Sequence, residues 1–146
     1  MSREFIVYGE PVGKGRPKFT TISGFTKTYT PEKTVSFENL VKLSYQEAFG
    51  NEKPFDKDEQ LEVRITAFFQ IPKSASKKKA AQMLSGFIKP TKRPDLDNVA
   101  KAVLDALNKI AFYDDSQIIA LSMSKFYSDK PRTEISIRSD ELWKKI

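Results

Sequence analysis

Four aspartates in two tight pairs flank one strongly amphipathic segment of the sequence. Asp95 and Asp97 stand near the start of the run KRPDLDNVAKAVLDALN, and Asp114 and Asp115 follow it in FYDDSQ. The chain has no histidine and no cysteine, which excludes thiolate nucleophiles, the commonest general base and the commonest transition-metal ligands. Any bound metal must therefore be a hard cation such as Mg²⁺ or Mn²⁺, held by carboxylates, carbonyls and water.

The first pair has a structural interpretation as well as a chemical one. Aspartate is a favoured N-cap and a second acid suits the helix dipole, so each would stabilise a helix by about 1 kcal/mol. Asn98 and Lys101 follow on the same polar side, with Lys101 one turn after Asp97. This set fits a divalent cation beside a phosphate, although Asp97 and Lys101 could equally form an ordinary surface ion pair.

The second pair, Asp114 and Asp115, also has two interpretations. Aspartate and serine are common in polar turns between a helix and a strand. Alternatively, one of these two carboxylates is a further metal ligand. The residues alone leave both interpretations open.

Positive charge is spread over three loops or short elements. The formal net charge is +6 and the sequence pI is about 9.4, which favours an anionic partner such as nucleic acid. The segment GEPVGKGRPK lacks the spacing of a phosphate-binding P-loop and has glycine where the Mg²⁺-binding Ser or Thr must stand. This segment is interpreted as a flexible basic loop whose cations are free to contact DNA phosphates. The segments SASKKKAAQ and KPTKRP add further positive charge. The candidate DNA-binding residues are Lys14, Arg16, Lys18, Lys92 and Arg93.

The element pattern predicts one α+β domain over residues 1–146. Strands are predicted at 3–8, within 60–72, after the acidic turn at 113–117, and at 132–139. Helices are predicted at 31–49, 74–84 and 95–109, the last from apolar residues at i, i+3, i+4 and i+7. A short hairpin is expected around Gly24, and the last two strands are expected to pair as a hairpin. The predicted sheet is mixed, largely antiparallel and packed against two or three helices.

No apolar run approaches the roughly 18 residues that a membrane span needs, and the N-terminal residues lack the apolar core of a secretory signal. The expectation is a soluble, intracellular protein.

The run KRPDLDNVAKAVLDALN followed by FYDDSQI resembles the RusA family of Holliday-junction resolvases, small endonucleases usually encoded by prophages. IVYGEPVGKGRPKF resembles the first strand and basic loop of that family. These matches span most of the chain in order, and residues 20–60 are the least distinctive. The resemblance implies a bacterial or phage-encoded protein that is cytoplasmic, forms a homodimer and takes part in DNA recombination and repair. Such a dimer binds four-way DNA junctions and makes paired symmetric nicks with Mg²⁺ or Mn²⁺, without a nucleotide cofactor.

The resemblance also implies roles for individual residues. Asp95, Asp97 and Asp115 would be the catalytic carboxylates, with Asp114 beside them at the metal, and Lys101 would be the catalytic lysine. The interval from Lys101 to the second pair is one residue shorter than in the family's pattern. That difference leaves open whether Asp114 or Asp115 faces the metal.

The function expected on these grounds is metal-assisted hydrolysis of a DNA phosphodiester. The alternative is a non-catalytic DNA-binding module of a prophage recombination or replication system. In that module the aspartates would only cap helices and keep the protein surface soluble. A nucleotide-sugar transferase using Asp95 and Asp97 would need more chain than 146 residues provide. A 15-residue helix spans about 22 Å, so within one subunit the two acidic pairs meet only if residues 110–114 double back along the helix, which five residues can barely do. A two-fold dimer offers another route, because it could bring one subunit's first pair beside the other subunit's second pair.

Overall fold

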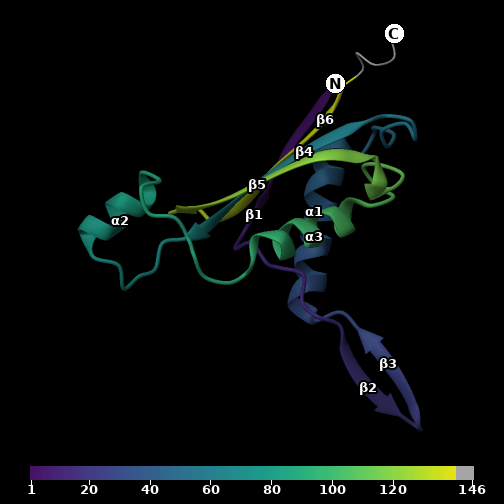
Figure 1. The fold of residues 1–146 in the computed structure, drawn as a ribbon, viewed down its shortest axis with the longest axis horizontal. Helices are drawn as coiled ribbons and strands as arrows, with labels where there is room; N and C mark the ends of the chain where they lie inside the picture. Colours follow the sequence, from purple (N-terminus) through teal and green to yellow (C-terminus); the bar gives the residue numbers. More distant parts are fainter. Residues whose placement is uncertain (141–146) are drawn as a thin grey trace.

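A four-stranded mixed sheet forms the centre of the computed structural model, which describes residues 1–140 (Figure 1). Its strands, in spatial order, are β1 (Ser2–Tyr8), β6 (Arg132–Ser139), β4 (Leu61–Gln70) and β5 (Ile118–Ser128). Both β1 and β4 pair antiparallel with β6, whereas β4 and β5 run parallel. The sheet is therefore mixed and largely antiparallel, as predicted.

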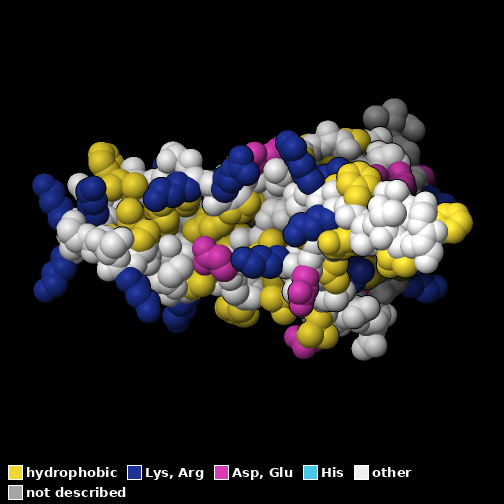
Figure 2. Space-filling view, turned by 90° about the horizontal axis from the view of Figure 1, so that it is seen from below, with side chains coloured by type: hydrophobic (Ala, Val, Ile, Leu, Met, Phe, Trp, Pro, Cys, Tyr) yellow, Lys and Arg dark blue, Asp and Glu magenta, His cyan; other side chains and the backbone are white. Residues whose placement is uncertain are grey.

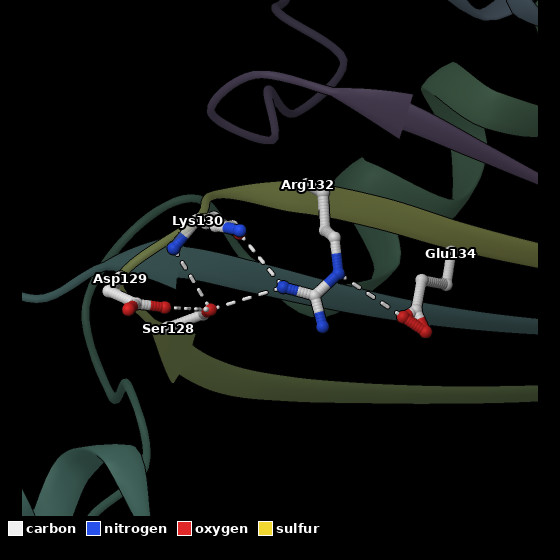
Figure 3. Close-up of polar contacts among 5 residues, drawn as sticks. All are labelled: Ser128, Asp129, Lys130, Arg132 and Glu134. Carbon is white, nitrogen blue, oxygen red and sulfur yellow. Dashed lines mark hydrogen bonds and ion pairs between the residues drawn. The ribbon is translucent and has the colours of Figure 1, made fainter.

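The predicted hairpin of the last two strands is wrong. Residues 129–131 join β5 to β6, a length that usually indicates a hairpin, yet β4 lies between these strands. The alternating residues of β4 bury one whole face, so this strand takes a central place. The Arg132 guanidinium fixes the crossing: it donates to Ser128 Oγ at 3.1 Å and to the Lys130 carbonyl at 2.9 Å (Figure 3). It also lies 3.9 Å from the centre of the Phe68 ring of β4.

Two helices pack on one face of the sheet, below it in Figure 1. They are α1 (Glu32–Phe49) and α3 (Leu96–Leu107), which contact each other and the sheet through their apolar faces. A third helix, α2 (Lys77–Leu84), buries no residue and lies beyond one end of the sheet. The three predicted helices are thus confirmed, each shorter than predicted. None of the helices within residues 1–140 is long and apolar enough to cross a membrane.

A hairpin of β2 (Lys18–Ile22) and β3 (Phe25–Tyr29) extends away from the rest of the molecule (Figure 1). Its turn contains Ser23 and Gly24, whose φ angles of 52° and 83° are both positive. Such a two-residue turn matches the twist of paired strands. The hairpin expected around Gly24 is confirmed.

The segment before this hairpin is held between the first turns of α1 and α3. The side chain of Thr34 in α1 donates to the Gly13 carbonyl at 3.2 Å and accepts the Gly15 N–H at 3.0 Å. The Lys14 N–H donates to the Asn98 carbonyl of α3 at 2.7 Å. The expectation of a flexible loop is therefore wrong for residues 13–15, because their backbone is bonded to both helices.

The Lys14 side chain strengthens the same connection. Its ammonium lies 2.6 Å from Glu38 Oε1 of α1 and 3.2 Å from Asp105 Oδ2 of α3. Partial burial alone would lower the pKa of Lys14, but hydrogen bonds and charges from the two carboxylates outweigh it and raise that pKa above its ordinary value. Lys14 therefore serves inside the fold, where the sequence analysis expected it to be free for DNA.

Replacing Lys14 by methionine keeps the aliphatic stem and removes the ion pairs. We expect Lys14→Met to lower the free energy of unfolding by about 1–2 kcal/mol, between the values typical of exposed ion pairs and of buried hydrogen bonds to charged groups. Urea denaturation followed by circular dichroism measures this change. Arg16→Met is the matched control, because Arg16 is exposed and makes no ion pair within residues 1–140. An equal loss in both variants would contradict the assigned role of Lys14.

Candidate functional site

The first turn of α3 presents a carboxylate that does not cap the helix. Asp95 occupies the N-cap position with extended backbone angles, yet its side chain makes no capping hydrogen bond. Only its backbone carbonyl serves the helix, accepting the N–H groups of Asn98 and Val99. The Asp95 side chain is exposed. The capping interpretation therefore fails for Asp95, and its carboxylate is available to a ligand.

Asp97 and Lys101 lie on the same exposed side of α3. Asp97 Oδ1 accepts the Asn98 N–H at 3.0 Å, a single bond that leaves most of the acceptor capacity of the carboxylate unused. Within residues 1–140, Lys101 takes part in no ion pair. The alternative of an Asp97–Lys101 surface ion pair is therefore not realised, and both charged groups face solvent.

A lysine that sequence analysis missed holds the loop before Asp95. Lys125 of β5 donates to the Lys92 carbonyl at 2.6 Å and to the Pro94 carbonyl at 2.9 Å. Its ammonium also lies 5.4 Å from the centre of the Phe69 ring, within the range of a cation–π contact. The signal in the sequence was a lysine at a β5 position where strand alternation directs the side chain toward the helices.

Residues 13–15, which are bonded to α1 and α3, and the loop of residues 92–94 together form the rim of the site. A Cβ atom on Gly13 would lie 2.8 Å from Pro94 Cβ and 3.2 Å from Asn98 Cβ, so only glycine allows this close approach. Substitution there would push the loop away from the start of α3. The shallow depression so formed is lined by Gly13, Lys14, Arg93, Pro94, Asp95 and Asn98.

Most of the candidate DNA-binding residues are exposed, and Arg93 lines this depression. The side chains of Arg16, Lys18, Lys92 and Arg93 are all exposed, whereas Lys14 is engaged in its ion pairs. Figure 2 shows Lys and Arg side chains distributed along this side of the molecule, from the α2 end to the hairpin end, with only scattered acidic side chains among them. Such a distribution suits a polyanion that runs along the surface.

The two members of the second acidic pair have different surroundings. Asp114 accepts the Ser116 N–H at 3.0 Å and caps the short helix η1 (Asp115–Gln117), in a reciprocal arrangement with Gln117. Hydrogen bonds from the side chain and backbone of Ser116 hold the pKa of Asp114 below its ordinary value. The Asp115 side chain is exposed and forms no hydrogen bond or ion pair in the described part of the chain, whereas its backbone carbonyl accepts the Ile118 N–H. The structural interpretation therefore applies to Asp114, and Asp115 is the free carboxylate.

The two acidic pairs do not meet within one subunit. The bonds of Lys125 place the start of α3 beside residue 125 of β5, whereas Asp115 precedes the first residue of that strand, Ile118. At ~3.3 Å per residue, residues 118 to 125 alone span roughly 23 Å. Accordingly, no group of three or more acidic residues within 1–140 is arranged to hold a metal ion. One subunit offers Asp95 and Asp97 at one place and Asp115 at another.

Asp95 and Asp97 nevertheless suit a hard divalent cation. Mg²⁺ usually keeps several waters and is held by one or two protein carboxylates together with phosphate oxygens of the substrate. Two exposed carboxylates that have few hydrogen bonds of their own meet that requirement. Lys101, one turn further along α3, would then face a phosphate bound at the same place.

Comparison with known proteins identifies the family of the chain. The sequence profile of the family described as Endodeoxyribonuclease RusA matches residues 8–138. An uncharacterized protein of Bacillus subtilis, YqaN, is 39% identical over 137 residues, which cover 92% of this chain and 94% of that protein. A crossover junction endodeoxyribonuclease of Lactococcus phage r1t is 38% identical over 84 residues, or 57% of each chain. The chain belongs to the RusA family of endodeoxyribonucleases.

Proposed function

We propose that this protein is a structure-selective endonuclease that resolves Holliday junctions by divalent-metal-assisted hydrolysis of DNA phosphodiesters. Family membership supports a nuclease acting on branched DNA. The single observation that carries the catalytic assignment is the Asp95 carboxylate, which stands at a helix N-cap without capping the helix. If the aspartates were purely structural, as in a non-catalytic DNA-binding module, the N-cap carboxylate would be expected to accept a backbone N–H of α3.

The proposed mechanism assigns separate tasks to the residues around the start of α3. Asp95 and Asp97 would hold a divalent cation, which would supply an activated water as the nucleophile and positive charge to offset the negative charge developing on the phosphate. Lys101 would stabilise the additional negative charge of the transition state. Arg93 and Lys92 would hold the DNA backbone on the rim, and Lys125 would position the loop that carries them.

The catalytic assignment predicts a separation of binding from cleavage. Asp97→Asn should lower Mg²⁺-dependent cleavage of a synthetic four-way junction by about 100-fold or more, because it weakens binding of the cation that would stabilise the transition-state charge. Junction affinity should be unchanged or higher, because a negative charge near the phosphates is removed. Gel assays of cutting and of binding in EDTA measure the two quantities.

Asp58→Asn is the matched control for this experiment. Asp58 is exposed and makes no hydrogen bond or ion pair in the described residues, so this variant changes the net charge equally outside the site. It should cut at the wild-type rate. Wild-type turnover by Asp97→Asn would contradict the metal site, and wild-type protein that binds the junction without cutting it would favour the non-catalytic alternative.

We infer further that the active unit is a homodimer with shared sites. The Asp115 carboxylate is free but precedes β5, whereas the start of α3 lies beside Lys125, and residues 118 to 125 of that strand span roughly 23 Å. Two-fold packing could bring the Asp95 and Asp97 of one subunit beside the Asp115 of the other, and would create two equivalent sites. Two sites are what paired nicking of a junction requires.

Mixing inactive variants tests the shared site. Asp97→Asn and Asp115→Asn proteins are each expected to be inactive alone. In a shared-site dimer, a mixed dimer carries both lesions in one site and leaves the other intact, so single-strand nicking of the junction should return. Subunits with different tags prove the exchange by co-purification. If exchange is proven and nicking stays absent, each site is confined to one subunit.

The salt dependence of junction binding tests the basic rim. Removing the side chain that binds one phosphate should reduce the slope of log K against log salt by about one. The double variant Arg16→Ala/Lys18→Ala should therefore reduce it by about two. Lys14→Met should leave the slope unchanged, because the Lys14 ammonium already neutralises Glu38 and Asp105. A reduction by Lys14→Met, with none in the double variant, would reverse these assignments.

A further inference from the structure

The β2–β3 hairpin exposes a set of large apolar side chains that the fold does not cover. Every residue of its two strands is exposed except the half-buried Thr20. A two-stranded hairpin on its own is at best marginally stable in water. The exposed fractions are 71% for Phe19, 58% for Ile22, 74% for Phe25 and 49% for Tyr29. Surface of this kind indicates a binding partner.

The strand register gathers the cations and the apolar tip on one side of the hairpin. Directly opposed residues of an antiparallel pair point to the same face, and so do every second residue along each strand. Lys18 opposes Tyr29, Thr20 opposes Lys27, and Ile22 opposes Phe25. These six residues therefore share one face, with Ile22 and Phe25 side by side at the tip. Phe19 lies on the opposite face, among threonines.

The charge of the hairpin selects the class of partner. Residues 11–31 contain Lys14, Arg16, Lys18 and Lys27 but no aspartate or glutamate. Two such hairpins from two copies of the chain would repel each other, whereas lysines that alternate with aromatic and aliphatic side chains suit a polyanion with flat apolar bases. Nucleic acid is the partner that this combination of charge and apolar surface fits.

The hairpin also begins at the rim of the candidate active site. Strand β2 starts three residues after Gly15, which is bonded to α1, and Gly13 packs against Pro94 and Asn98 at the start of α3. A five-residue strand extends about 17 Å at ~3.4 Å per residue, which exceeds the ~12 Å width of the DNA major groove. DNA held at the site is therefore within reach of the tip.

We propose that Ile22 and Phe25 form an apolar wedge that enters the DNA at the branch point of the junction, while Lys18 and Lys27 contact the flanking phosphates. Apolar side chains inserted between base steps must first unstack them. Stacking is already interrupted where four arms meet, so the wedge enters there at a lower cost than in continuous duplex. The wedge thus supplies selectivity for branched DNA, and this inference rests on the proposed function.

The test uses the full chain and a synthetic four-way junction with 2-aminopurine at the branch point, in EDTA so that no strand is cut. Wild-type protein should raise the fluorescence, because 2-aminopurine brightens when it is unstacked. The double variant Ile22→Ser/Phe25→Ser should abolish the rise. It should also lower the preference for junction over linear duplex by about tenfold, the size of the contribution of one stacked base.

Phe19→Ser is the matched control, because it removes an equally exposed aromatic ring from the opposite face of the same hairpin. It should retain both the fluorescence rise and the preference. Equal behaviour of the tip variant and the wild type would overturn the wedge. A change in the mass of the DNA-free tip variant by light scattering would overturn it too, by assigning the tip to contact between subunits.

Cleavage by the wild type in Mg²⁺ is measured in parallel and separates the two proposals. Cutting without any effect of the tip substitutions would leave the nuclease function standing and remove the wedge. A fluorescence rise that depends on the tip, without cutting by the wild type, would support the wedge and remove the nuclease function.

Discussion

The position of the start of α3 is the constraint on which the rest of the site depends. The loop before it is held to β5 by Lys125, and the glycine-rich segment beside it is held to α1 by Thr34 and Lys14. Both connections use hydrogen bonds to backbone carbonyls or to carboxylates, so they fix orientation as well as distance. Asp95 and Asp97 consequently stand on a rigid helix end, although the loops around them are short and polar.

This arrangement separates structural cations from exposed ones. Lys14 and Lys125 are bonded to the protein itself, and their bonds place the backbone around the depression. Arg93 is exposed at the depression, and Arg16 and Lys18 are exposed where the chain leads into the β2–β3 hairpin. Some cationic side chains therefore hold the fold together and others remain exposed to solvent. Burial and the presence of nearby acceptors decide which role each side chain has.

The same division holds among the acidic residues. Asp114 caps a short helix and Asp105 neutralises Lys14, so both carboxylates are engaged within the fold. Asp95 and Asp115 have no such partners among residues 1–140. Sequence alone could not sort these carboxylates, because an aspartate at a helix start or in a turn has the same neighbours in the chain whether or not its side chain is engaged.

The sequence by itself determined the elements and the chemistry that is possible. Helical periodicity located α3, strand alternation located β4, and the lack of histidine and cysteine restricted any metal to oxygen ligands. Only the tertiary structure decided that β4 lies between β5 and β6, that residues 13–15 are bonded to α1 and α3, and that Asp114 is engaged in a cap while the Asp115 carboxylate is free. The physical reason is that periodicity reports which face of an element is buried, whereas strand order and side-chain pairing depend on contacts between residues far apart in the chain.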